Sequence, residues 1–411
     1  MNTINAGDTA WVLFSSALVM LMTPGLAFFY GGMVRKKNVL SILMQCFIVV
    51  CLLSVQWVLY GYSIAFAPGE GFWGGFQWFG LNGVGLEPYA DYAATIPHQA
   101  FMIFQAMFAI ITPALILGAF AERMKFSAFI AFVLLWATFV YGPVCHWVWG
   151  IGGFLRKMGA LDFAGGTVVH VNAGIAALTT ALLIGKRANI EKSIPSPHNM
   201  PFVVLGTGLL WFGWFGFNAG SALAANGLAV NAFVVTNTAA AAAGLSWAAI
   251  EWLRNGKATI LGACSGAVAG LVAITPAAGF VSVIPAIIIG LLVSVFCFTA
   301  VSIIKPKLGY DDSLDAFGVH CVGGIWGALA TGLFASKSVN AAGADGLFFG
   351  NPGQFLVQLI AVAVTLIYSL VASTVIYKLV DIFIGVRVDQ KEEAMGLDLT
   401  QHRERAYTVL E

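Results

Sequence analysis

The sequence predicts an all-α polytopic membrane protein, and three observations carry that prediction. The chain has 411 residues, of which 20 are basic and 19 acidic, so that 9% are charged, whereas soluble domains carry about 25%. Hydrophobic residues make up 59% of the chain, and the mean hydropathy is +0.88. The apolar residues also gather into long segments of the length that a membrane-spanning helix needs, which is about 20 residues. A soluble enzyme is therefore excluded, and a net charge of +1 gives no basis for binding nucleic acid.

Eleven such segments follow one another along the chain. Asp8 is the only charged residue ahead of the first segment. The segment thus lacks the basic leader of a signal peptide and is also too long for one, so we interpret it as a retained span. The eleventh is longer than a bilayer requires, and we expect it to tilt or to project. The predicted spans are 9–32, 40–67, 98–121, 126–149, 164–185, 200–224, 228–252, 258–278, 281–304, 316–336 and 353–384. We expect one membrane domain over residues 1–384 and a polar cytoplasmic tail over residues 385–411.

The basic residues of the loops predict the orientation. All of the 20 basic residues except Arg156, Lys157 and Lys337 fall on one side if the spans alternate in direction, and Lys192 is among those on the basic side. Loops rich in Lys and Arg stay in the cytoplasm. The sequence thus predicts an external N-terminus, a cytoplasmic C-terminus and an odd number of spans.

Two segments 150 residues apart share one pattern. Residues 162–170 and 312–320 each begin with Asp and end with Val-His, and Gly-Ile follows both at the same offset. Five spans separate the copies, so the copies point in opposite directions through the membrane. This predicts an inverted repeat of five plus five helices with an eleventh helix added. Such repeats place the transport path near the bilayer midplane, at the interface between the repeats.

Ionisable residues inside the spans are candidates for function, because a charge in lipid is costly. The repeat would bring His170 and His320 together, so we favour a paired-histidine site whose Nδ1 atoms share a hydrogen bond. The alternative is two unrelated neutral histidines, each bonded to a neighbouring helix. Asp162 has two equally supported roles, as the N-cap of its helix or as a group that contacts a cation or proton. The aromatic residues at the outer ends of the spans either pack in the interfacial belt or form a cation–π site.

Small residues and cysteines favour structural interpretations. Gly262, Gly266 and Gly270 follow the small-xxx-small spacing of close helix packing, as do the pairs Gly216/Gly220 and Gly323/Gly327. The six cysteines lie in or beside apolar segments and none has a C-x-x-C partner, so they indicate buried thiols. Disulfide and zinc sites are therefore poorly supported. We also expect no other metal site, no cofactor and no enzymatic activity.

Several longer motifs resemble those of the Amt/Mep/Rh ammonium transporter family, and the bacterial AmtB-type proteins most closely. The resemblance runs in order along nearly the whole chain. The motifs are Phe-Tyr-Gly-Gly at 29–32, Ala-Glu-Arg at 121–123, Asp-Phe-Ala-Gly-Gly-Thr-Val-Val-His at 162–170, Gly-Trp-Phe-Gly-Phe-Asn-Ala-Gly-Ser at 213–221, Leu-Gly-Ala-Cys-Ser-Gly-Ala at 261–267 and Phe-Gly-Val-His at 317–320.

The resemblance implies an eleven-helix protomer of a homotrimer in the plasma (inner) membrane, with a separate pore in each protomer for ammonium or ammonia and for methylammonium. Residues 396–407 resemble the regulatory tail of the family, which implies a cytoplasmic PII-family (GlnK-type) partner. The implied residues form a recruitment site, a gate and a pore lining: Trp149, Phe108, Ser221 and Asp162 for recruitment, Phe108 and Phe217 for the gate, and His170, His320, Trp214, Gln105 and Thr275 for the pore.

An apolar pore accounts for selectivity, because ammonium can release a proton and cross as ammonia, whereas potassium keeps its charge. Whether the histidine pair also relays the proton is left open. Three alternatives compete with this interpretation: a haem protein with His170 and His320 as axial ligands, a sensor with the same fold, and a channel for another neutral gas.

Overall fold

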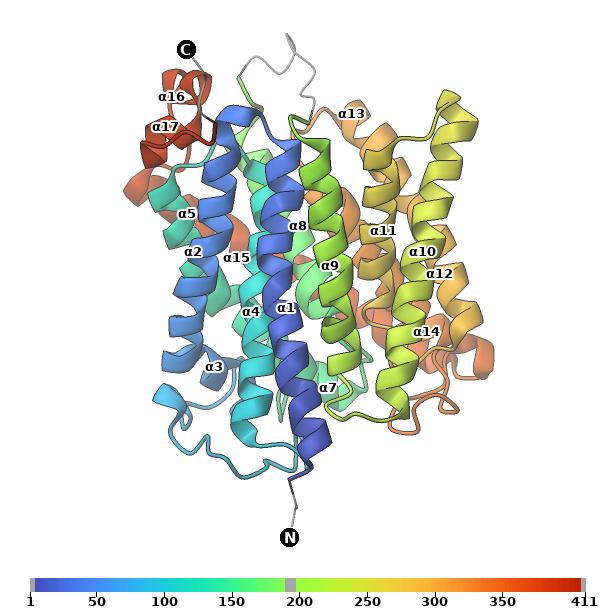
Figure 1. The fold of residues 1–411 in the computed structure, drawn as a ribbon. Helices are drawn as coiled ribbons and strands as arrows, with labels where there is room; N and C mark the ends of the chain where they lie inside the picture. The colour runs from blue at the N-terminus through green and yellow to red at the C-terminus, as the bar shows by residue number, and fades with distance from the viewer. Residues whose placement is uncertain (1–3, 189–196, 408–411) are drawn as a thin grey trace.

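The protein is a helical bundle. The computed structural model describes residues 4–188 and 197–407, and all regular elements there are helices apart from one bridge between Met124 and Arg387. The helices stand side by side, with the N-terminus at one end of the bundle and the C-terminus at the other (Figure 1). We call these ends the N-terminal face and the C-terminal face.

Five spans form the first half of the bundle, and three of them contain a π-helical turn. They are α1 (Ala6–Met33); α2 (Val39–Gln56) continued by η2 (Trp57–Gly61) and α3 (Tyr62–Phe66); α4 (His98–Phe120); α5 (Phe126–Trp136) continued by η4 (Ala137–Tyr141) and α6 (Gly142–Trp149); and η5 (Gly166–Val171) continued by α8 (Asn172–Ile184). Short helices η1 (Lys36–Asn38), η3 (Phe79–Leu81) and α7 (Phe154–Met158) lie in the loops.

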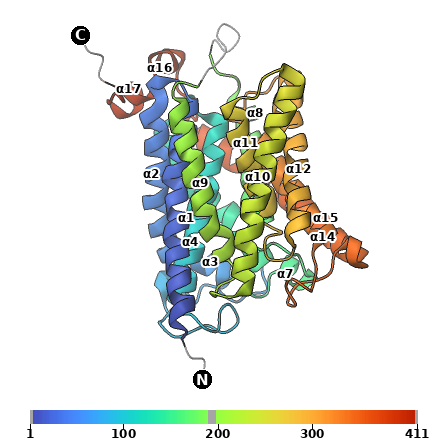
Figure 2. The same ribbon diagram turned by 45° about the vertical axis from the view of Figure 1, so that its right-hand side comes forward.

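Six spans and the tail follow. The spans are α9 (Met200–Gly220); α10 (Gly227–Asn255); α11 (Ile260–Ile274); α12 (Val283–Thr299) continued by η6 (Ala300–Ile304) and α13 (Lys305–Leu308); η7 (Phe317–Cys321) continued by α14 (Val322–Phe334); and, after η8 (Leu347–Phe349), α15 (Pro352–Ile384). The tail forms α16 (Gln390–Met395) and α17 (Leu397–His402), which lie at the C-terminal face beside α2 (Figure 2).

Ten helices in the described part of the chain are long and apolar enough to cross a membrane, and they coincide with ten of the predicted spans. The eighth predicted span, 258–278, is too long, because α11 has only 15 residues. The α-helix ends at Ile274, ahead of Pro276, which has no N–H to continue the hydrogen-bond ladder. The carbonyl of Pro276 instead accepts a hydrogen bond from the N–H of Phe163 at 3.2 Å, which joins this turn to the loop before η5.

The two repeated segments contact each other reciprocally. A Cβ atom on Gly174 would lie 2.3 Å from the backbone nitrogen of Cys321, and a Cβ atom on Gly324 would lie 3.0 Å from that of Val171. These residues correspond to one another at the 150-residue offset of the repeat. Such an exchange of equivalent contacts is what a two-fold relation between the copies produces, and both copies begin with a π-helical turn.

Glycines let α1 and α9 approach closely along their length. A Cβ atom on Gly206 would lie 2.3 Å from the backbone nitrogen of Phe29, and one on Gly216 would lie 2.6 Å from Cβ of Leu18. The small-residue contact predicted for the sixth segment is therefore present. It places α9, which carries several candidate residues, firmly against α1.

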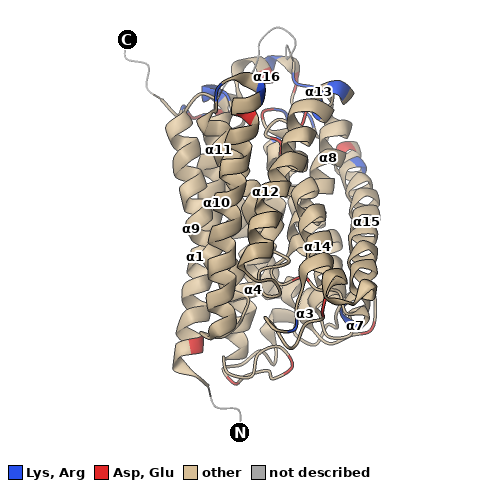
Figure 3. Cartoon of the chain, turned by 90° about the vertical axis from the view of Figure 1, so that its right-hand side faces the viewer, with Lys and Arg blue, Asp and Glu red and all other residues tan. Residues whose placement is uncertain are grey.

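The charged residues lie at the ends of the bundle (Figure 3), and Lys and Arg gather at the C-terminal face. Large apolar side chains cover the sides of the spans, where Phe47, Leu245 and Ile367 are each more than 60% exposed. A surface of this kind matches a bilayer rather than water. Lys192, which the orientation argument also used, lies outside the described residues.

Candidate functional site

Asp162 organises the start of η5. Its Oδ1 atom accepts hydrogen bonds from the backbone N–H groups of Gly165 and Gly166 at 2.8 and 2.6 Å, and Oδ2 accepts those of Thr167 and Val168 at 2.8 and 3.1 Å. The carboxylate thus satisfies four first-turn donors that a helix otherwise leaves unpaired. The N-cap role predicted for Asp162 is present, and its side chain is 7% exposed.

Asp162 also lines a cavity of about 250 Å³ at the N-terminal face, which we call the vestibule. The indole Nε1 of Trp149 donates a hydrogen bond to the backbone carbonyl of Asp162 at 2.8 Å, which fixes the tryptophan at the vestibule wall. The Ser221 hydroxyl donates to the carbonyl of Phe217 at 2.9 Å, so its oxygen lone pairs stay available to a ligand. Gln105 lines the same cavity, and its buried Oε1 has no hydrogen-bond partner among the described residues.

Two phenylalanines close the bottom of the vestibule. Phe108 from α4 lines the vestibule, and its ring lies 4.2 Å from that of Phe217 from α9, at an interplanar angle of 30°. Trp149 meets Phe108 edge-on at 5.9 Å. Both phenylalanine side chains are essentially buried, at 1% and 0% exposure. The ring pair thus lies between the vestibule, which Phe108 lines, and a second cavity, which Phe217 lines.

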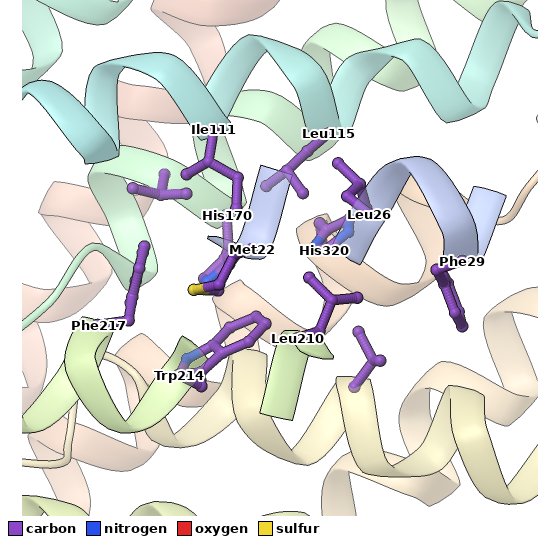
Figure 4. A pocket seen from close by; sticks show the side chains of 12 residues that line it. Met22, Leu26, Phe29, Ile111, Leu115, His170, Leu210, Trp214, Phe217 and His320 are labelled. Carbon is purple, nitrogen blue, oxygen red and sulfur yellow. The ribbon is translucent and has the colours of Figure 1, made fainter. Parts of the chain in front are cut away.

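Beyond the ring pair lies a narrow lumen, lined mostly by aliphatic and aromatic side chains (Figure 4). The centre of a water-sized molecule can occupy about 10 Å³ of it, which is the space for about one such molecule. Phe217 lines one end of the lumen, and His170 and His320 are its only ionisable lining residues. Trp214 also lines the lumen, but its indole N–H already donates to Thr275, so the unoccupied polar atoms described there belong to the two imidazoles.

The structure brings His170 and His320 together, as the repeat predicts. Their ring centres lie 5.4 Å apart and their planes differ by 11°. The predicted hydrogen bond between the two Nδ1 atoms is wrong, because neither Nδ1 has a partner among the described residues. The neighbouring Trp214 ring lies nearly parallel to His170, at 5.4 Å and 16°, and this packing contributes to the orientation of the imidazole.

Trp214 and Thr275 form a support for the histidine pair. The indole Nε1 of Trp214 donates to Thr275 Oγ1 at 2.8 Å, and the threonine hydroxyl donates to the carbonyl of Leu271 at 2.7 Å. Thr275 is the residue directly after α11. The helix therefore ends at the level where Thr275 accepts the hydrogen bond of Trp214. Every sequence-predicted site residue thus lies in the vestibule, the ring pair, the lumen or this support.

Sequence reasoning missed Arg156 as a residue of the vestibule. Its Nη1 donates to the carbonyl of Trp149 at 2.8 Å, and its guanidinium lies 5.6 Å from the centre of the Tyr92 ring. Trp149 is the last residue of α6, so Arg156 caps that helix and adds a positive charge to the vestibule wall. The available signal was that Arg156 is one of the three basic residues on its side.

A buried cluster of ion pairs at the C-terminal face was also not predicted. Glu122 accepts hydrogen bonds from Arg35 Nε at 2.9 Å and from Asn38 Nδ2 at 2.8 Å. Asp311 binds the Arg187 guanidinium in a bidentate pair at 3.0 and 2.9 Å, and Arg123 Nη1 donates to the same carboxylate at 3.0 Å. Buried charges of this kind are retained only when they are paired.

These partners set the protonation of the acidic members. Burial acts to raise the pKa of Glu122, but the hydrogen bond and charge of Arg35 outweigh it and hold the pKa below its ordinary value. Burial likewise opposes the charge of Asp311, and the charges of Arg123 and Arg187 lower its pKa. Both carboxylates are therefore ionised near neutral pH.

The tail docks onto this cluster. The backbone N–H of Leu397 donates to Asn38 Oδ1, and Asp398 Oδ1 accepts the backbone N–H of Ser41, each at 2.8 Å. Asp398 thereby caps the first turn of α2, which has no side-chain cap from its own N-cap residue. Glu393 accepts the N–H of Ala188 at 2.6 Å, which ties the tail to the loop after α8.

Comparisons with known proteins identify the family of the chain. The sequence profile described as "Ammonium Transporter Family" matches residues 10–407. The chain belongs to the ammonium transporter family. It is 55% identical to the Ammonium transporter of Bacillus subtilis over 401 residues, which covers 98% of each chain, and 50% identical to Ammonium transporter Amt1 of Archaeoglobus fulgidus, covering 98% of this chain and 99% of the relative.

Solved structures agree with this assignment. The crystal structure of Saccharomyces cerevisiae Mep2 superposes with a TM-score of 0.89 at 37% identity, covering 95% of this chain and 89% of that one. A structure described as a Sensor Amt Protein superposes with a TM-score of 0.87 at 30% identity, covering 96% of this chain and 98% of that one. The multi-pass, all-helical membrane architecture predicted from the sequence is confirmed.

Proposed function

We propose that this protein transports ammonium across the plasma (inner) membrane, from the vestibule towards the C-terminal face. Membership of the ammonium transporter family and the relatives named ammonium transporters support the transported species. The gathering of Lys and Arg at the C-terminal face supports a cytoplasmic placement of that face and an external N-terminus.

Ammonium is recruited in the vestibule. The aromatic faces of Trp149 and Phe108 attract a cation, at about 0.5–2 kcal/mol per contact. The lone pairs of Ser221 accept an N–H hydrogen bond and replace part of the hydration shell. The negative charge of the Asp162 carboxylate also attracts the ammonium ion, although its oxygens already accept hydrogen bonds from four backbone N–H groups.

The ammonium then releases its proton near the Phe108–Phe217 ring pair, either to water in the vestibule or to the histidine pair, and continues as ammonia. The narrow, largely apolar lumen is the observation that carries this step, because an unpaired ion in an apolar environment costs far more than a neutral molecule of the same size. Three ring nitrogens of His170 and His320 have no hydrogen-bond partner among the described residues, and they can accept from ammonia or donate to it. Whether they also relay the proton decides between electrogenic and electroneutral transport.

Two assemblies complete the proposal. We expect three protomers, each with its own pore, and a PII-family (GlnK-type) signal protein that binds at the cytoplasmic face beside the tail. The haem alternative finds no support in the geometry, because the lumen has space for about one water-sized molecule and a porphyrin does not fit there.

The test is uptake of labelled methylammonium into proteoliposomes that contain the purified protein. We expect saturable uptake that excess ammonium inhibits and excess potassium does not. His170→Asp places a charge in the lumen and should change uptake strongly, while Phe217→Leu loosens the ring pair and should weaken discrimination against potassium. Leu253→Ala, on a side chain that is 89% exposed at the end of α10, is the matched control and should transport normally.

Currents recorded during an ammonium pulse separate the two proton schemes, because neutral ammonia alone moves no charge. Wild-type uptake that potassium suppresses as well as ammonium does would contradict transport through an ion-excluding lumen.

A further inference from the structure

An apolar groove on the side of the bundle runs between α1 and α2, which pack against each other near the C-terminal face (Figure 1). It has a volume of about 410 Å³, and its walls are apolar over most of their length. Met20, Ala27 and Phe28 line it from α1, and Leu40, Phe47 and Val50 line it from α2. Neither the proposed pore nor the ion-pair cluster uses these side chains.

The groove has the depth of one membrane leaflet. Residues 20–28 of α1 and residues 40–50 of α2 span about 12 and 15 Å at the helical rise of about 1.5 Å per residue. Half of the hydrocarbon core of a bilayer is about 15 Å thick. The groove therefore extends from the C-terminal face to about the bilayer midplane, which is the depth that an acyl chain of that leaflet occupies.

A second cavity of about 260 Å³, lined by both charged and apolar residues, lies at the mouth of the groove, between the loop after α1 and the tail. Lys36, Lys37 and Arg405 line it together with Asp398 and Glu404. Glu404 also lines the apolar groove, so the two spaces meet at this residue. An apolar slot thus continues into a charged chamber at the level of the membrane surface.

The chamber presents free charges of both signs. Lys37 is occupied, because its Nζ donates to the carbonyls of Glu393 and Ala394. Lys36, Glu404 and Arg405 are exposed and take part in none of the ion pairs among the described residues.

Asp398 is 3% exposed and uses Oδ1 to cap α2. Its Oδ2 is buried and has no hydrogen-bond partner within the described chain. A buried acceptor without a donor is costly, so this oxygen calls for an N–H or O–H from a ligand.

We propose that the groove and chamber together bind one phosphatidylethanolamine molecule of the leaflet at the C-terminal face. One acyl chain lies between α1 and α2, the phosphate is held by Lys36 and Arg405, and the ammonium group donates to Glu404 and to the free oxygen of Asp398. The proposal rests on the membrane placement of the bundle and is independent of the species that crosses the pore.

The charge pattern distinguishes this headgroup from others. A phosphatidylglycerol headgroup has a phosphate for Lys36 and Arg405 but no ammonium group to pair with Glu404. The quaternary ammonium of phosphatidylcholine has no N–H to donate to Asp398. Of these three headgroups, only that of phosphatidylethanolamine combines a phosphate with a primary ammonium and so complements both pairs of protein charges.

The bound lipid would connect the tail to the first two spans. Its headgroup contacts residues of the tail and of the loop after α1, while its chain contacts α1 and α2. Lipid composition of that leaflet would then influence how firmly the tail docks.

The test places the photoreactive amino acid benzoylphenylalanine at Phe47, whose side chain lines the groove and is 67% exposed. The full-length protein is reconstituted in vesicles of phosphatidylcholine that contain equal minor fractions of phosphatidylethanolamine and phosphatidylglycerol, irradiated, and analysed by mass spectrometry. We expect adducts with phosphatidylethanolamine at least about five-fold above those with phosphatidylglycerol.

The variant Glu404→Gln/Arg405→Gln should lower this preference by about five-fold, which lies within the range for two exposed ion pairs. Both residues are exposed, so the melting temperature should stay at the wild-type value. Benzoylphenylalanine at Phe139, which is 43% exposed and does not line the groove, is the control and should label the lipids in proportion to their abundance. Equal labelling at Phe47 would overturn the proposal, as would adducts between two protein chains, which would show that a second copy covers the groove.

Discussion

Replacing Asp162 by Asn tests whether the carboxylate holds the start of η5 in place. An asparagine keeps one oxygen, and its amide nitrogen must face two backbone N–H groups in place of the second. The weaker pair, formed by Oδ2 with Thr167 and Val168 at 2.8 and 3.1 Å, is the pair that would be lost. Hydrogen bonds to a charged group contribute about 1.5–3 kcal/mol each, so the loss is about 3–6 kcal/mol.

The repeat provides a matched control at Asp312, the equivalent carboxylate before η7. Within the described chain it accepts two backbone N–H groups, from Ala316 at 3.1 Å and from Phe317 at 2.8 Å. Asp312→Asn can keep one of these bonds and should lose about 1.5–3 kcal/mol, about half of the cost at Asp162. The pair of variants therefore compares the same chemical change at two related positions.

The measurement is the melting temperature of each purified variant in detergent, together with methylammonium uptake in proteoliposomes. We expect Asp162→Asn to melt well below Asp312→Asn and to lose uptake, because η5 carries His170. The reasoning is refuted if Asp312→Asn is the less stable of the two, or if Asp162→Asn melts with the wild type.

Three further predictions follow from the geometry. Gly174→Ala should prevent stable folding, whereas Gly208→Ala, with nothing within 4 Å of the added Cβ, should fold normally when both are compared by size-exclusion chromatography. Arg156→Gln should lower the KM for methylammonium about two-fold at low ionic strength, because it removes a positive charge beside a cation site; an unchanged KM would contradict this. The lowered pKa values of Glu122 and Asp311 stabilise the fold above their unfolded-state values of about 4 and lose that effect as the pH falls through the folded-state values. The melting temperature should accordingly fall between about pH 5 and pH 3, and less steeply in Glu122→Gln.

The spans could be predicted because a bilayer leaves the backbone few choices. Each segment has to satisfy its own hydrogen bonds in lipid, so a long apolar run is a helix almost regardless of its neighbours. The contact between His170 and His320 was also predictable, because the 150-residue offset implies a two-fold relation. The end of α11 could not be predicted in the same way. The turn at Pro276 is held by the hydrogen bond from the N–H of Phe163, and that partner comes from a distant loop.

Other features depend on tertiary structure that residue types do not specify. The orientation of the two imidazoles depends on the packing of Trp214 against His170. The prediction of an Nδ1 hydrogen bond did not take that neighbour into account. Glu122 and Asp311 are acidic residues of loops, and the neighbouring residues in the sequence do not indicate that both form buried ion pairs with arginines. The sequence identified Arg156 only as a loop charge. Its hydrogen bond to the carbonyl of Trp149 depends on the position of α7, which turns the side chain towards the end of α6.

The caps that the tail provides have a consequence for biogenesis. Asn38 and Ser41 are synthesised 359 and 357 residues before the groups that bind them, Leu397 and Asp398. Until those residues emerge from the ribosome, the N-terminus of α2 has no side-chain cap. Asn38 can donate to Glu122 through Nδ2, but its Oδ1 still lacks the N–H of Leu397. The first hairpin of the protein therefore reaches its final state last, and its completion marks a chain whose every span has already been inserted.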